Sequence, residues 1–190
     1  AGGGGRTLLR DAAADGGGLW NDGGTANLSN ALIAGNTGGA APDARGVLRS
    51  LGYNLTGNVA GHSWDPGSPS MVGNLPGVAP RLGALSDQGN LGPMHPPLYD
   101  SPIIDAGGAG LTVDGRGLLR PIDFTHLANA SGGNGNDIGA FELQVATPTN
   151  VVGTPQNGAI SVAFSGGSNG GQTITGYSAT CGSQTVSGSA

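Results

Sequence analysis

Short apolar runs, each ended by Asn or Gly, fill the first third of the chain. Within residues 16–39 three asparagines each follow an apolar residue by two or three positions, in the pairs Leu19–Asn21, Leu28–Asn30 and Ile33–Asn36. Asparagine tolerates the left-handed backbone conformation and bonds neighbouring backbone groups, so it readily ends a strand. Residues 47–59 repeat the pattern. Such short runs favour stacked parallel coils over hairpins, because each coil can bury its apolar row on the next coil.

The types of charged residue point in the same direction. All seven basic residues are Arg, and Glu142 is the single Glu among the twelve acidic residues. Lys and Glu favour exposed helices, whereas Asp, Asn and the 40 glycines of this chain favour turns. No window of helical length is both amphipathic and free of proline. The sequence therefore predicts an all-β chain with a high density of turns.

Charge and hydropathy also exclude some partners. The net charge is −5 and no basic run occurs, which argues against binding to nucleic acid. No apolar run approaches the ~20 residues of a membrane span. Cys181 is the single cysteine, so no disulfide is expected within the chain. The chain opens on Ala and four Gly without Met or a leader, and we expect it to be a fragment of a longer protein.

Residues 100–143 form a distinct segment, called here the closing segment. Two short apolar runs, 102–104 and 137–141, are separated in it by Gly-rich turns and several acids. We expect this segment to end a first domain, residues 1–146, by covering the apolar row of the last coil. After it the composition changes, and residues 159–164 and 174–181 alternate as strands. Residues 147–190 are therefore predicted to form a second domain.

Four ordered motifs carry a resemblance to a known family. They are LGYNL (51–55), LGALSDQGNLGPMHPPLYDSPIIDAG (82–107), VDGRGLLRPID (113–123) and NDIGAFEL (136–143). In this order they resemble the carboxy-terminal part of bacterial choice-of-anchor surface proteins of pectate-lyase-like architecture, and the likeness covers residues 16–143. It implies the end of a right-handed parallel β-helix with an irregular closing segment. The family's usual Gly-Gly-Pro-Thr turn is replaced here by residues 90–94.

The second domain resembles the first half of a bacterial fibronectin type III domain. That resemblance implies that Phe164 and Tyr177 are the aromatics of its second and third strands. A complete domain of this kind needs about 90–100 residues, so residues 147–190 are expected to be a truncated sandwich that exposes its inner face.

The closing segment holds the candidate metal ligands. Asp105, Asp114, Asp137 and Glu142 are the residues that could bind calcium or act as paired carboxylates on a glycosidic bond. We favour the alternative that these acids, together with Asp123, cap turns and pair with Arg. Residues 132–137 begin like a calcium-binding nonapeptide, but the motif occurs once, whereas a calcium roll needs tandem copies. No cofactor is expected, apart from calcium under the first interpretation.

Aromatic residues are the best candidates for ligand binding. Trp20, Trp64 and Tyr99 could stack on sugar rings, and the alternative for each is a place in the core or at a coil edge. The Gly166–Gly170 stretch has the letters of a nucleophile elbow, but no helix or His follows it. The three histidines lie about 30 residues apart, outside any metal-ligand spacing. No catalytic residue is assigned.

These observations favour a structural or adhesive role for a secreted or cell-surface protein. A β-helix stalk would hold an upstream surface away from the cell, and the fibronectin-like part would be a spacer. A polysaccharide or cell-surface glycan is the partner class that this implies. The alternatives are a fragment of a polysaccharide lyase or glycoside hydrolase of β-helix fold, or a carbohydrate-binding module.

Overall fold

The fold consists of short strands joined by turns. The computed structural model describes residues 15–89, 92–124, 126–144, 148–166 and 176–189, and these contain strands and no helix. The all-β class is therefore confirmed. The strands are β1 (Leu19–Trp20), β2 (Ala26–Leu28), β3 (Leu32–Ile33), β4 (Ala44–Ser50), β5 (Leu55–Thr56), β6 (His62–Trp64), β7 (Leu75–Pro76), β8 (Ser86–Asp87), β9 (Pro93–Met94), β10 (Thr149–Gln156), β11 (Ala159–Ser165), β12 (Gly176–Cys181) and β13 (Gln184–Ser189).

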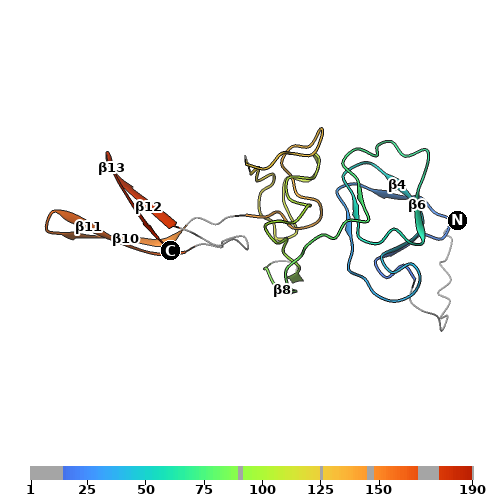
Figure 1. The fold of residues 1–190 in the computed structure, drawn as a ribbon, viewed down its shortest axis with the longest axis horizontal. Coiled ribbons are helices and arrows are strands. Elements are labelled where there is room, and N and C mark those ends of the chain that lie inside the picture. The colour runs from blue at the N-terminus through green and yellow to red at the C-terminus, as the bar shows by residue number, and fades with distance from the viewer. Residues whose placement is uncertain (1–14, 90–91, 125, 145–147, 167–175, 190) are drawn as a thin grey trace.

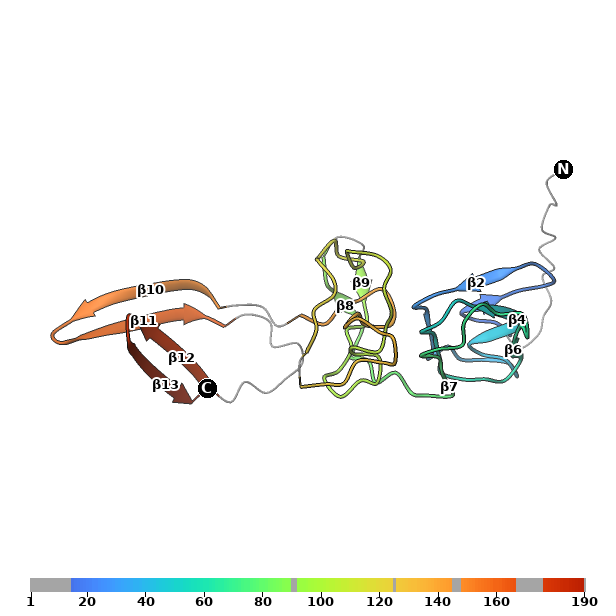
Figure 2. The same ribbon diagram turned by 90° about the horizontal axis from the view of Figure 1, so that it is seen from above.

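The first seven strands are arranged in three layers. Strand β4 pairs in parallel with β1, β2 and β6, and β5 pairs in parallel with β3 and β7. Strands β1–β3, β4–β5 and β6–β7 therefore form layers 1, 2 and 3, each hydrogen-bonded to the next (Figures 1 and 2). Each ladder is only two or three residues long. The predicted parallel pairing of successive short runs is confirmed.

Asparagine side chains bind the layers together at the strand ends. Asn54 accepts a bond from the amide of Ala31 in layer 1 at 3.0 Å and donates to Leu28 O at 3.1 Å. Asn74 of layer 3 in turn accepts from the Asn54 amide at 2.9 Å. Asn54 and Asn74 directly precede β5 and β7, and each side chain satisfies backbone groups of the layer before its own.

The core lies between the layers and the closing segment. Leu32, Leu55 and Leu75 are in register across β3, β5 and β7, so their side chains point to the same face. Leu55 packs there against Ile103 and Ile138, and all three are at most 1% exposed. The closing segment therefore covers leucines of all three layers. The expected cover of the last coil is thus part of a larger contact, because Leu75 of layer 3 packs against the same cluster as Leu55 and Leu32.

The closing segment also bonds to the layers through polar groups. Asn30, whose φ of 49° is left-handed, accepts from Gly108 N at 2.8 Å with its side chain and from Gly139 N at 2.9 Å with its carbonyl. The Tyr53 hydroxyl donates to Ser131 O at 3.0 Å. Strands β8 and β9 form a small antiparallel hairpin before this segment. Residues 90 and 91 of the altered turn lie outside the described residues.

The predicted second domain, residues 147–190, is called here the tail. Its described residues form two antiparallel hairpins, β10–β11 and β12–β13. The two strands expected in it are found at β11 and β12, apart from residues 174–175, which lie outside the described residues. The rings of Phe164 and Tyr177 meet edge to face with centroids 4.6 Å apart. Its apolar side chains are exposed, among them Ile160 and Val186. No Asp, Glu, His, Lys or Arg follows Glu142 in the sequence.

Gly46 is a position where layer 1 and layer 2 approach too closely for a side chain. It has a φ of 99°, and an added Cβ would lie 2.0 Å from the carbonyl oxygen of Asn21. We expect Gly46→Ala to cost about 1–2 kcal/mol for the backbone conformation and about 1–3 kcal/mol more for the contact. Gly23→Ala is the matched control, because Gly23 has a φ of 88° and open space around it. Equal urea midpoints for the two variants would contradict this close approach.

Candidate functional site

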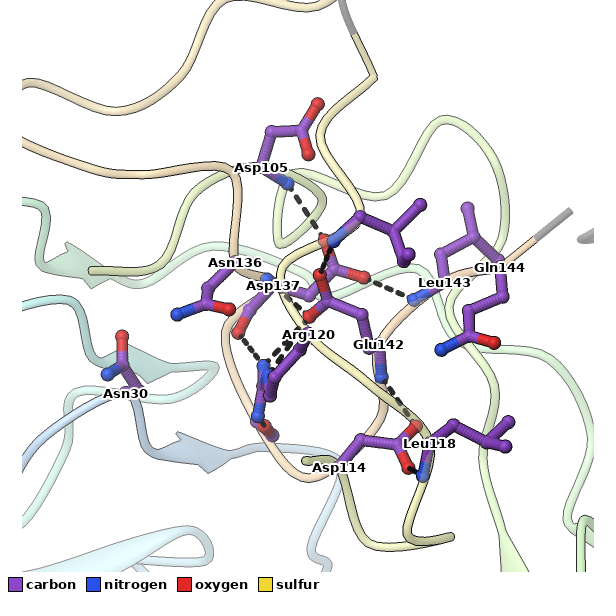
Figure 3. Close-up of polar contacts among 12 residues, drawn as sticks. Asn30, Asp105, Asp114, Leu118, Arg120, Asn136, Asp137, Glu142, Leu143 and Gln144 are labelled. Carbon is purple, nitrogen blue, oxygen red and sulfur yellow. Dashed lines mark hydrogen bonds and ion pairs between the residues drawn. The ribbon is translucent and has the colours of Figure 1, made fainter. Parts of the chain in front are cut away.

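The predicted acids of the closing segment do come together. Glu142, Asp137 and Asp105 are completely buried, and Asp114 is nearly so. The Glu142 carboxylate lies beside Arg120, with Asp137 next to it and the loop that holds Asp114 on one side, whereas the Asp105 carboxylate points away from Arg120 (Figure 3). Asp123, the fifth acid considered, is exposed. The result is a compact polar cluster inside an otherwise irregular segment.

Glu142 is the centre of this cluster. Its Oε2 forms a buried ion pair with Arg120 at 3.0 Å and accepts from the Asp137 amide at 2.9 Å. Its Oε1 accepts from the Ile122 amide at 2.7 Å. Arg120 donates further to the carbonyls of Asp137 and Gly139, at 2.6 and 3.1 Å. Both charges are therefore satisfied by fixed partners, as a buried pair requires.

Asp137 and Asp114 accept backbone N–H groups in the same way. Asp137 accepts from the amides of Asp105 at 2.9 Å and Leu143 at 2.6 Å. Asp114 accepts from the amides of Leu118 and Glu142, at 3.1 and 3.2 Å, and pairs with Arg116 at 2.6 Å. These bonds are the turn-capping network that the sequence favoured over a metal site.

The same geometry bears on the calcium interpretation. Calcium takes six to eight oxygen ligands, and most carboxylate oxygens of the cluster already accept N–H groups. Among the described residues no group of three or more His, Cys, Asp or Glu is placed to hold a metal ion. Two buried oxygens, Asp105 Oδ1 and Asn136 Oδ1, have no hydrogen-bond partner. By themselves, these two oxygens supply fewer ligands than the six to eight that calcium takes.

Burial and mutual repulsion shift the pKa values of the acids in the cluster. Burial, followed by the charge of Glu142, raises the pKa of Asp137 to about 7. Burial also raises the pKa of Asp105 to about 6, and the charges of Asp123 and Glu142 add to the effect. For Asp114, burial opposes ionisation, but the hydrogen bonds from Arg116 and from backbone amides outweigh it, so that its pKa is lowered.

These shifts predict that the chain is more stable in mild acid than at neutral pH. Asp105 and Asp137 have a higher pKa folded than unfolded, so their stabilising contribution is complete below about pH 4 and is lost as the pH rises through 6 and 7. Each extra proton held by the folded state changes the unfolding free energy by about 1.4 kcal/mol per pH unit. Below pH 4 the lowered pKa of Asp114 acts in the opposite direction.

Urea unfolding between pH 3 and 8 measures this profile. We expect a maximum near pH 4 and a fall in the unfolding free energy up to about pH 7. The fall should be smaller in Asp137→Asn, whose side chain stays neutral. The groups that face the two aspartates are Glu142, Asp123, His126 and Arg120. A maximum near pH 8 in the parent chain would contradict the raised pKa values.

The three aromatic candidates do not form one row. Trp20 is 56% exposed, and the Arg45 guanidinium lies 5.7 Å from its ring centre. Trp64 is in register with Leu48, which is completely buried. The Trp64 side chain therefore lies on the same face of the sheet as Leu48, which is the face opposite to that of Trp20. Tyr99 belongs to a different region, where it stacks on His126. A sugar chain could not contact all three rings at once.

An apolar groove is the feature that sequence reasoning missed. It has a volume of about 630 Å³, and its wall includes Leu32, Leu82, Leu85, Met94, Ile103 and Phe141. No Asp or Glu lines it, so it offers no carboxylate pair for acid–base chemistry. The apolar run 102–104 was the available signal, because it contributes Ile103 to the wall. A second cavity, of about 770 Å³, lies between the tail hairpins and also lacks charged residues.

Comparison of the chain with protein-family models, curated proteins and solved structures gives no match. In the part of the chain that the structure describes, no helix has the length and apolar character needed to cross a membrane. Residues 167–170 of the nucleophile-elbow stretch lie outside the described residues.

Proposed function

We propose that this chain is a structural part of a secreted or cell-surface protein. In this proposal the three layers are the last coils of a right-handed parallel β-helix stalk, and the tail is a fibronectin type III-like spacer. The observation that carries it is the parallel register of β3, β5 and β7, which aligns three leucines against the closing segment. Layers stacked in this way make a stiff element that contacts only its neighbours.

The burial of the acidic cluster supports a structural role over a catalytic one. A catalytic carboxylate must come within hydrogen-bond reach of its substrate. Glu142 and Asp137 have no exposed surface and are bonded to Arg120 and to backbone amides. The cluster then serves to hold the loops of the irregular closing segment to one another, where regular strands are lacking.

Pulling the full chain between its ends tests the stalk proposal. Residues 15–144 should unfold as one unit, because the closing segment and the layers share one core. At ~3.5 Å per residue the roughly 130 residues release about 450 Å of contour length in one step. A gradual low-force extension of the layers before the closing segment would overturn the proposal.

A carbohydrate-binding module is the second candidate, supported by the exposed ring of Trp20 beside Arg45. A panel of polysaccharides added to the full chain during thermal melting tests it. A ligand that binds only the folded state adds about 2.7 kcal/mol at a hundredfold excess over its dissociation constant. A shift with one glycan that disappears in Trp20→Ala would favour this candidate, and cleavage of that glycan would favour the enzyme alternative.

A further inference from the structure

Strand β4 turns one row of side chains to the outer face of its sheet. Arg45, Val47 and Arg49 form this row, because they alternate with the completely buried Ala44 and Leu48. Strands β2 and β6 lie on either side of β4 (Figure 2), and side chains in register with the row share its face. The six residues, called here the β4 face, are Trp20, Asn27, Arg45, Val47, Arg49 and Ser63.

Two apolar side chains of the β4 face are exposed. Trp20 is 56% exposed and Val47 is 52% exposed. The side-chain amide of Asn21 donates to Val47 O at 2.6 Å and to Gly24 O at 2.8 Å, so the loop between β1 and β2 is tied to β4. The two apolar side chains are therefore held beside each other on one surface. Exposed apolar surface of this kind suits the C–H faces of sugar rings.

Each end of the row carries an arginine beside an acid. Arg45 pairs with Asp15, whose carboxylate also accepts the amide of Ala41 at 2.9 Å. Arg49 Nε lies 4.0 Å from Asp65 Oδ2, beyond hydrogen-bond range, and has no hydrogen-bond partner among the described residues. The charges of the two pairs cancel, so the face offers donors and acceptors without a net charge. This suits neutral hydroxyl groups, and the net charge of −5 on the whole chain opposes a polyanion.

We propose that the β4 face binds a neutral, linear polysaccharide, whose chain lies along β4 from Trp20 to Arg49. A hydroxyl group both donates and accepts, so sugar hydroxyls can bond to both members of an Arg–Asp pair. Arg45 and Arg49 are four positions apart, which is about 13 Å along a strand. A single sugar ring cannot span that distance, so the site requires an oligosaccharide. The inference rests on the carbohydrate-binding candidate and adds the class of its ligand and the path of the bound chain.

Titration calorimetry of the full chain tests the inference. The neutral probes are cellohexaose, xylohexaose, mannohexaose and glucose, and the acidic probe is polygalacturonate. At least one neutral hexaose should bind, and glucose should bind far more weakly. Arg49→Ala should weaken binding of that hexaose by about tenfold or more, because a hydrogen bond from a charged donor is lost at the far end of the site. Arg81→Ala is the matched control, since Arg81 is also an exposed arginine paired with an acid, and parent-like binding is expected.

The outcomes separate the inference from the candidate on which it rests. Binding that is lost in Trp20→Ala but unchanged in Arg49→Ala would overturn the path along β4 and leave the carbohydrate-binding candidate standing. Binding of polygalacturonate alone would overturn the neutral class and would also leave that candidate standing. Binding of none of these probes would overturn both.

Fluorescence provides a second, independent readout of the position of the ligand. The sequence contains two tryptophans, Trp20 and Trp64, so the emission of Trp64→Phe reports Trp20 alone. The hexaose that binds should shift this emission to shorter wavelength, because a stacked sugar ring displaces water from the indole, and the shift should saturate at the concentrations that saturate the heat of binding. Heat of binding without any change in the emission of Trp20 would overturn the proposal.

Discussion

Glu142→Gln is expected to lower the unfolding free energy by about 3 kcal/mol. The substitution keeps the shape of the side chain and removes the charge that faces Arg120. An ion pair buried at both ends, as this one is, cannot lose one partner without leaving the other charge desolvated, which typically costs about 3–5 kcal/mol. We place the value at the lower end because the neutral side chain also relieves the repulsion of Asp137. Equilibrium urea unfolding at pH 7 measures the change.

The pair of Arg81 and Asp100 is the matched control. It also joins an Arg to an acid, but both side chains are more than half exposed. Asp100→Asn should therefore change the unfolding free energy by no more than about 1 kcal/mol. The argument would fail if the two substitutions had the same effect, or if Glu142→Gln left the pH profile unchanged in the range where Asp137 titrates.

Ile138→Ala is expected to destabilise the chain by about 2–5 kcal/mol. Ile138 is completely buried, and it forms the core cluster with Leu55 and Ile103. Its amide also donates to Ile103 O at 3.0 Å, so the backbone around it is held and cannot collapse easily into the cavity. Because this cluster joins the closing segment to the layers, both parts should lose stability together.

Leu111→Ala is the control for this substitution. Leu111 also lies in the closing segment, but it is 76% exposed, and a change there should stay within about 0.5 kcal/mol. Hydrogen exchange adds a second measurement, since Ile138→Ala should speed exchange at β5 amides as well as in the closing segment. An effect confined to residues 100–143 would contradict a shared core.

Local chemistry allowed the sequence to predict the all-β class and the parallel pairing. Asparagine and glycine end short runs through their own backbone preferences, which need no knowledge of distant contacts. The Arg and Asp pairs of the closing segment were foreseeable for a similar reason. Their residues lie within about 40 positions of one another, and buried carboxylates must find donors.

The remaining features depend on contacts between distant residues. Leu55 meets Ile103 and Ile138 across 48 and 83 positions of sequence, and no pattern around Leu55 specifies those partners. The sequence also could not predict the face of the sheet to which the Trp20 and Trp64 side chains point, because that depends on the register of β1 and β6 on β4. A shift of one residue in either ladder would reverse the side to which the ring points.

The tail contributes nothing to the response of the chain to acid. Every carboxylate, imidazole and guanidinium side chain precedes residue 143, so between about pH 5 and 8 the folding equilibrium of the tail hairpins has no Asp, Glu or His proton to exchange. Over this range the stability of the layers and the closing segment therefore depends on pH, whereas that of the tail does not. A melting transition whose midpoint does not move over that range reports the tail, and one that moves reports the layers with their closing segment.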